Sequence, residues 1–270
     1  MATILLSAGT TAAFSEDLPL WEAGIGATVI GFPDYLGSDQ YNVWPLPFPY
    51  FVYRGDFLTV DRDAISGQLL ETPRFNIKVS ASGALPVDSD DNDARRGMDD
   101  LDPVVEIGPS LQYTLFQTAD RYGDLLIDLP IRAAATVTHK RIDGIGWTAN
   151  PRLRYIHDQP WQGGRLHFDA SIGPFYGNDR YHDYFYAVDE EFARPDRPTY
   201  DPDGGYGGWR LSLGFSHRVG QWWYGGFVRY FDLNDAEYAD SPLVERRDAL
   251  FGGVAFAWVF AESSRPGQRR

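Results

Sequence analysis

Charged side chains recur at alternating positions along several segments of this chain, where they could line an enclosed interior. Both signs are present, and the ten candidates are Glu22, Glu106, Asp124, Asp128, Asp169, Arg132, Arg152, Arg154, Arg165 and Arg210. Charges confined to a narrow interior should pair, because an unpaired buried charge is costly. The pattern therefore predicts either a salt-bridged plug that makes the interior rigid or an ion-selective pore.

The other reactive side chains give little support to catalysis. A lipid hydrolase would need a serine and a histidine that face each other. Ser216 and His217 are sequence neighbours, so they point to opposite faces of an extended strand. His167 and Ser171 share a face, but nothing in the sequence marks either as activated. We therefore expect no catalytic residue and no enzymatic activity.

Metal and cofactor sites are not expected either. The five histidines lack a metal-binding spacing such as H-E-x-x-H; they are His139, His157, His167, His182 and His217. Carboxylates in the acidic segment 88–102 suit calcium or magnesium, but their spacing does not match an EF-hand loop, so a solvated loop is favoured. The chain has no cysteine, which excludes disulfides and thiolate metal sites.

Strands of alternating polarity are the elements that must position the interior charges. In residues 248–260, Leu250, Phe256 and Trp258 fall on one face and smaller residues on the other, because side chains alternate along a strand. The same alternation predicts strands at 21–29, 75–85, 105–115, 125–137, 145–155, 166–176 and 209–218. Residues 221–233 are aromatic on both faces, so the orientation of that strand is weakly specified.

These segments predict an all-β, antiparallel transmembrane β-barrel of about twelve strands over residues 20–260, with both termini on the periplasmic side. Pairing of the last strand with the first would remove the open edges.

Residues 47–70 do not alternate cleanly, and Pro45, Pro47 and Pro49 cannot donate to a ladder, which indicates an irregular or edge-like strand. The segment 88–102 then falls on the periplasmic side, where turns should be short. Either an early strand is miscounted or this turn is unusually long.

Composition agrees with a membrane barrel. Aromatic residues make up 15% of the 270 residues (8 Trp, 16 Tyr and 17 Phe), and such rings gather at the two membrane interfaces of a barrel. No apolar run approaches the roughly 18 to 20 residues that a spanning helix needs. The net charge of -14 disfavours nucleic acid as a partner, because phosphates require a basic surface.

The two ends of the chain differ from the barrel segments. Residues 1–13 look like the apolar end of a secretory signal with a small-residue cleavage site at Thr11 to Ala13, but the basic n-region is missing. This indicates a truncated or misplaced start, and the alternative is a frayed N-terminus. Residues 261–270 form a polar C-terminal tail.

Four runs occur in order along the chain and together carry a family resemblance. They are P-D-Y-L-G-S-D at Pro33 to Asp39, P-x-P-F-P-Y-F-V-Y-R-G-D ending at Asp56, A-R-R-G-M-D-D-L-D at Ala94 to Asp102, and A-D-S-P-L-V at Ala239 to Val244. With the aromatic closing strand, they resemble the MipA/OmpV family of MltA-interacting outer-membrane proteins. The resemblance spans residues 21–260. One departure is that this chain continues beyond Phe260, where the family pattern ends.

The resemblance implies an outer-membrane β-barrel, surrounded by lipid and lipopolysaccharide. The best-known member is described as a scaffold that joins a lytic murein transglycosylase to a bifunctional penicillin-binding protein. Members are not described as having catalytic residues, so none is carried over to this chain. We therefore expect a non-enzymatic scaffold in murein remodelling. A small-solute pore and a barrel-borne lipid-modifying enzyme are the alternatives.

Overall fold

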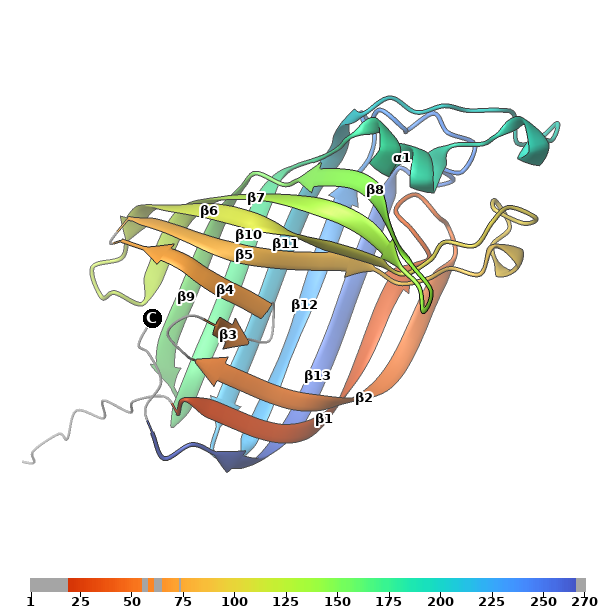
Figure 1. Ribbon diagram of the computed structural model, residues 1–270. Helices are drawn as coiled ribbons and strands as arrows, with labels where there is room; N and C mark the ends of the chain where they lie inside the picture. Colours follow the sequence, from red (N-terminus) through yellow and green to blue (C-terminus); the bar gives the residue numbers. More distant parts are fainter. Residues whose placement is uncertain (1–18, 55–57, 61–64, 73, 266–270) are drawn as a thin grey trace, which may run out of the picture.

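Antiparallel strands build one closed sheet (Figure 1). The computed structural model describes residues 19–54, 58–60, 65–72 and 74–265. The strands are β1 (Trp21–Pro33), β2 (Tyr41–Arg54), β3 (Leu58–Val60), β4 (Ile65–Glu71), β5 (Phe75–Ala84), β6 (Val104–Gln117), β7 (Gly123–Val137), β8 (Ile142–Ala149), β9 (Arg152–Trp161), β10 (Gly164–Gly177), β11 (Gly205–Val219), β12 (Trp222–Asp232) and β13 (Asp248–Glu262). Neighbours in sequence pair, except β8 and β9, which both pair with β7 and β10, and β13 pairs with β1 to close the ring.

These thirteen strands occupy twelve positions around the barrel, because β8 and β9 are two halves of one strand. β7 pairs with β9 through residues 123–128 and with β8 through residues 131–137. Asn150 and Pro151 separate the halves, and the Asn150 side chain donates to the Pro174 carbonyl oxygen at 2.7 Å. The predicted antiparallel barrel of about twelve strands is confirmed.

The outer and inner faces of the barrel differ in polarity. Outward-facing Ile25, Ile131 and Val254 are each more than half exposed. Glu106 of β6 and Asp128 of β7 point inward and are buried. A continuous belt of exposed apolar side chains is unusual on a soluble monomer. It matches the lipid-facing band of a membrane barrel.

Helices are few and short. α1 (Asp179–Tyr186) and the 3-10 helices η1 (Ser89–Asp91) and η2 (Glu190–Phe192) lie in connections between strands. In the described part of the chain, no helix has the length and apolar character that a membrane crossing requires.

The connections are long at one end of the barrel and short at the other. Residues 34–40, 85–103, 178–204 and 233–247 join strands at what we call the loop end. At the opposite turn end, the connections at 162–163 and 220–221 have two residues each. The two ends of the sheet meet at the turn end, where the Ser263 amide donates to the Trp21 carbonyl oxygen at 2.8 Å.

The segment 88–102 lies at the loop end, so its expected place beside the termini was wrong (Figure 1). The cause is the region from Leu58 to Glu71, which alternation treats as one strand. It contains two short antiparallel strands, β3 and β4. One additional strand reverses the direction of the chain, and this moves the following connection to the other end of the barrel.

Among the described residues, most of β2 has a strand partner on one side only. β2 pairs with β1 from Tyr41 to Tyr53, whereas described residues of β3 reach only Tyr53 and Arg54. The Arg54 amide donates towards β1, so even-numbered amides of β2 face β1 and odd-numbered ones face the edge. Pro45, Pro47 and Pro49 therefore remove three N–H donors from that edge, as the sequence indicated.

Candidate functional site

The four long connections pack into one unit at the loop end, which we call the cap (residues 34–40, 85–103, 178–204 and 233–247). Its buried apolar residues form a single cluster that includes Tyr35, Leu101, Phe185, Tyr186, Leu233, Tyr238 and Leu243. Inward-facing Val104 and Ala134 belong to the same cluster, so the cap packs into the barrel mouth. Tyr186 and Tyr238 stack with ring centroids 3.7 Å apart. Burial of this apolar surface holds the four connections together.

Three of the four sequence runs that carried the family resemblance meet in the cap. They are residues 33–39, 94–102 and 239–244. The Tyr35 hydroxyl donates to the Leu243 carbonyl oxygen at 2.8 Å, and the Arg95 guanidinium donates to the Phe185 carbonyl oxygen at 3.1 Å. Burial lowers the pKa of Arg95 and raises the pKa of Tyr35. These runs thus specify how the cap folds.

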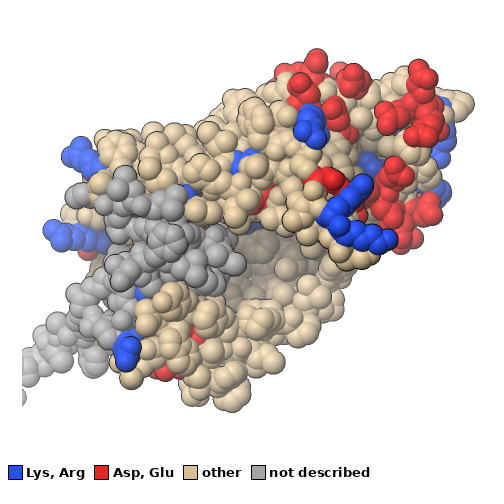
Figure 2. Space-filling view, in the orientation of Figure 1, with Lys and Arg blue, Asp and Glu red and all other residues tan. Residues whose placement is uncertain are grey.

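Acidic side chains gather at the loop end (Figure 2). In the segment 88–102, some carboxylates serve the local fold: Asp88 accepts from the Asp90 amide at 3.0 Å and Asp100 accepts from the Ser89 amide at 2.8 Å. Within the described ranges, no group of three His, Asp or Glu residues is placed to hold a metal ion.

His182 is a buried titratable group inside the cap. Its side chain is 0% exposed, its Nδ1 lies 2.8 Å from the Asp203 carbonyl oxygen, and its Nε2 has no partner among the described residues. Burial lowers the pKa of His182, and the Asp203 carbonyl partly opposes this shift. The neutral tautomer with Nδ1–H donating to Asp203 fits these contacts.

A cavity of about 2590 Å³ lies below the cap and extends to the turn end. Nine of the ten predicted interior charges line this cavity, and none of the described cap residues does. The tenth, Glu106, is buried under α1, where it accepts hydrogen bonds from Thr148 and Tyr181, each at 3.0 Å. The charges proposed from alternation are therefore gathered inside the barrel.

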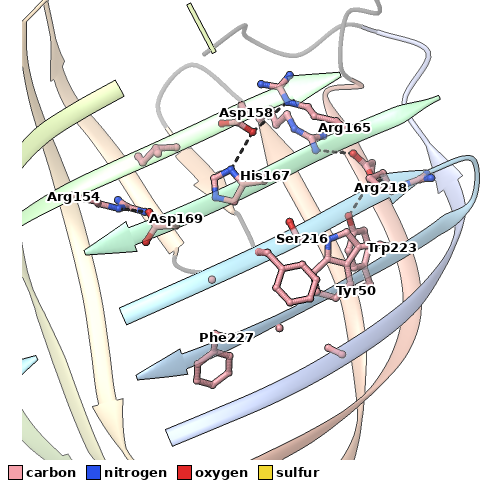
Figure 3. A pocket seen from close by; sticks show the side chains of 18 of the residues that line it. Tyr50, Arg154, Asp158, Arg165, His167, Asp169, Ser216, Arg218, Trp223 and Phe227 are labelled. Carbon is pink, nitrogen blue, oxygen red and sulfur yellow. Dashed lines mark hydrogen bonds and ion pairs between the residues drawn. The ribbon is translucent and has the colours of Figure 1, made fainter. Parts of the chain in front are cut away.

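Ion pairs join most of these charges across neighbouring strands, and Figure 3 shows the pair of Arg154 with Asp169. The pairs are Arg152 with Asp128 (2.5 Å), Arg154 with Asp169 (2.5 Å), Arg165 with Asp158 (3.3 Å) and Arg132 with Glu106 (3.9 Å). Asp124 instead accepts from the Gln117 amide at 3.0 Å, and Arg210 donates to the Ser212 hydroxyl at 3.3 Å. Pairing across strands ties neighbouring strands together inside the barrel.

Glu22 organises the densest of these clusters, at the turn end. It lies 2.6 Å from Arg54 and 3.1 Å from Arg218, and it accepts from the Tyr50 hydroxyl at 3.2 Å. Its side chain is only 3% exposed. One carboxylate thus compensates two guanidinium groups on β2 and β11, on either side of the β1–β13 closure.

A Ser, His and Asp alignment that sequence reasoning missed crosses three neighbouring strands. His167 Nδ1 lies 3.0 Å from Asp158 Oδ1, and the register places Ser216 directly opposite His167. All three residues line the cavity. Alternation could show that each faces inward, but only the strand register brings them together. Asp158 is shared with Arg165, so His167 has a competitor for that carboxylate.

Comparison with protein families gives one match over most of the chain. The family model described as "MltA-interacting protein MipA" matches residues 25–260. A comparison with curated protein sequences gives no match.

Solved structures resemble the chain only loosely. A "Bacterial polysaccharide outer membrane secretin" is 9% identical and covers 90% of this chain and 99% of its own, with a TM-score of 0.42. The Ralstonia pickettii toluene transporter TbuX is 9% identical (90% of each chain, TM-score 0.27). A Pseudomonas aeruginosa FadL homologue is 8% identical (89% and 90%, TM-score 0.27). These TM-scores are too low to carry an argument about this chain.

Replacing Glu22 with Gln should weaken the barrel, because Arg54 would lose its carboxylate and Arg218 would keep only the exposed Glu262 at 3.5 Å. We expect a loss of about 3 kcal/mol, the usual cost of leaving a buried charge uncompensated. The temperature at which the folded band disappears on a denaturing gel should fall. Glu190→Gln, on an exposed loop residue, is the control, and an equal shift in both variants would contradict the assignment.

The cap should loosen at acidic pH through His182. The folded-state pKa of His182 lies below the unfolded value of about 6.5. Above that pH, the stability that neutral His182 gives to the cap is therefore fully present. It is lost as the pH falls through the folded pKa, since the unfolded state binds the proton first. We would measure hydrogen exchange of cap amides at about pH 7.5 and about pH 5. Protection should fall at the lower pH in the native chain and fall less in His182→Gln. Equal pH dependence in both proteins would exclude His182 as the cause, and His139→Gln serves as the control.

Proposed function

The chain belongs to the MltA-interacting protein MipA family, and from this premise we propose that it is a non-enzymatic scaffold for murein-remodelling enzymes. Family membership and the lipid-facing belt identify an outer-membrane β-barrel. The family's description specifies an interaction with MltA, a murein transglycosylase. We extend the proposal to a lytic murein transglycosylase and a penicillin-binding protein as partners of this chain.

The closed loop end is the observation that favours a scaffold over a pore. The cap packs four connections into the barrel mouth as one apolar cluster, and the cavity has no lining from described cap residues. A solute entering from the turn end would therefore meet packed aromatic side chains. We therefore assign the partner to the surface of the barrel and not to its interior.

The turn end is the surface that we assign to the partner. Short turns of outer-membrane barrels face the periplasm, where murein lies. Arg74 and Arg121 are exposed there, and basic side chains are seen at this end in Figure 2. A positive patch of this kind attracts and orients an acidic partner surface.

Charge reversal at the turn end should reduce partner capture. We expect Arg74→Glu combined with Arg121→Glu to lower the recovery of murein hydrolase and synthase from envelope extracts by at least about tenfold, because like charges at an interface repel. The measurement is a pull-down with the purified barrel, followed by mass spectrometry.

Arg141→Glu combined with Arg246→Glu makes the same charge change at the loop end and should leave recovery unchanged. Heat-modifiable gel mobility shows that each variant is folded. If the native barrel captures no murein enzyme, the scaffold proposal fails. If both double variants lose capture equally, the turn end is not the docking surface.

A lipid hydrolase is a second candidate, favoured by the Asp158, His167 and Ser216 alignment. With Nδ1–H held by Asp158 at 3.0 Å, His167 Nε2 would accept the Ser216 hydroxyl proton while the serine oxygen attacks an ester carbonyl. The proton would then pass from His167 to the leaving alcohol, and water would release the acyl group.

Hydrolysis of lysophosphatidylglycerol tests this candidate. If Ser216 is a nucleophile, the purified barrel should release fatty acid and Ser216→Ala should abolish the release. Ser212→Ala, on the same inward face of β11, is the matched control and should retain it. Absence of release from the native barrel, or equal release from Ser216→Ala, would eliminate the hydrolase and leave the scaffold.

A further inference from the structure

Basic side chains are concentrated in the turn between β7 and β8, at the loop end. His139, Lys140 and Arg141 follow one another in this turn, and all three are exposed. Figure 2 shows Lys and Arg side chains at the end of this hairpin, whereas Asp and Glu gather over the cap. The turn is therefore a basic exception on an acidic end of the barrel.

The backbone of this turn is closed by its own hydrogen bonds. The Thr138 amide donates to the Arg141 carbonyl oxygen at 3.0 Å, and the Arg141 amide donates to the Thr138 hydroxyl at 3.2 Å. The Thr138 hydroxyl in turn donates to the Arg141 carbonyl oxygen at 3.2 Å. A ligand that binds residues 139–141 would therefore order little additional backbone, which favours affinity.

Arg180, the second residue of α1, adds a cation beside the same hairpin. Its guanidinium donates to the Gly144 carbonyl oxygen of β8 at 2.6 Å, and the residue is exposed. Gly144 follows Arg141 by three residues, a distance of about 10 Å along a strand. Two segments that are distant in sequence thus place cations along one stretch of the barrel wall.

Carboxylates compensate these cations only in part. Arg141 pairs with Asp143 at 2.6 Å, but the two side chains are 71% and 49% exposed, and exposed pairs of this kind contribute little. Asp179, next to Arg180, accepts a backbone amide hydrogen bond at 2.7 Å. Within the described residues, Lys140 and Arg180 form no ion pair. An anion could therefore bind both without displacing a carboxylate from either.

The apolar belt of the barrel reaches the base of this turn. Val137 and Ile142, the last residue of β7 and the first of β8, are paired and are 37% and 71% exposed. Trp147, further along β8, is 47% exposed, and tryptophan favours the membrane interface. Residues 139–141 thus lie where hydrocarbon gives way to lipid headgroups. Short turns face the periplasm, so the headgroups at this opposite end belong to the outer leaflet.

We propose that the β7–β8 turn and Arg180 bind the phosphate groups of a phosphorylated lipid in the outer leaflet. The phosphates accept charge-assisted hydrogen bonds from Lys140, Arg141 and Arg180, while the acyl chains lie against Ile142 and Trp147. A free phosphate ion has the same anion chemistry, but the apolar surface below the turn favours a lipid. The site lies at the opposite end of the barrel from the surface assigned to murein enzymes, so it does not depend on the scaffold proposal.

Native mass spectrometry of the purified full chain, titrated with diphosphorylated lipid A in neutral detergent, tests the proposal. Lys140→Gln combined with Arg180→Gln should lower the affinity by at least about tenfold, because each cation near an anionic lipid contributes about fivefold. Lys140→Arg combined with Arg180→Lys should retain most of the affinity. Asp143→Asn should tighten binding, because it removes a negative charge and releases Arg141.

A matched pair of variants in the cap controls for general effects. Arg96→Gln combined with Arg194→Gln makes the same charge change on exposed residues at the loop end and should leave the affinity unchanged. Heat-modifiable mobility verifies that each variant has folded. Equal losses of affinity in the two Gln double variants, or no loss in either, would overturn the assignment to the β7–β8 turn.

Lipids and ions of different chemistry separate the sources of binding. Dephosphorylated lipid A and phosphatidylcholine should bind more weakly than diphosphorylated lipid A, and inorganic phosphate should not displace the lipid. Equal binding of the dephosphorylated lipid would overturn the role of the phosphates. Displacement by inorganic phosphate as effective as that by free lipid A would indicate a site for the ion and overturn the lipid.

Discussion

Hydrogen bonding between β13 and β1 is the interaction on which the rest of the structure depends. In hydrocarbon no water can satisfy a free backbone group, so a spanning sheet must satisfy its own donors and acceptors. Closure brings the first and last strands together through ten paired positions. It also encloses the inward charges, so their pairing is a consequence of the closed ring. Glu22 pairs with Arg54 on β2 and Arg218 on β11, so these inward charges connect strands on both sides of the closure.

The sequence predicts the faces of the strands well because alternation is a local property. Nine of the ten charges proposed for the interior line the cavity for this reason. Strand register depends on distant residues, so Ser216 could not be placed opposite His167 from spacing alone. The count failed locally at Leu58 to Glu71, where two strands of three and seven residues are too short for periodicity to separate. The cap was also unpredictable, since its contacts join residues about 200 positions apart, such as Tyr35 and Leu243.

Charge is divided unevenly along the barrel axis. Carboxylates gather at the loop end (Figure 2). Among the described residues that line the cavity, Lys and Arg outnumber Asp and Glu, although the whole chain has a net charge of -14. This division gives the two ends of the barrel different electrostatic environments, which suits a protein whose two sides face different compartments.

The three prolines on the free edge of β2 set a limit on assembly. An edge with its carbonyls but without its amides cannot complete a ladder with an incoming strand. Pro45, Pro47 and Pro49 thus make this side of β2 a poor template for a second chain. The sheet cannot grow by strand exchange at this seam, and the barrel is held at its own circumference.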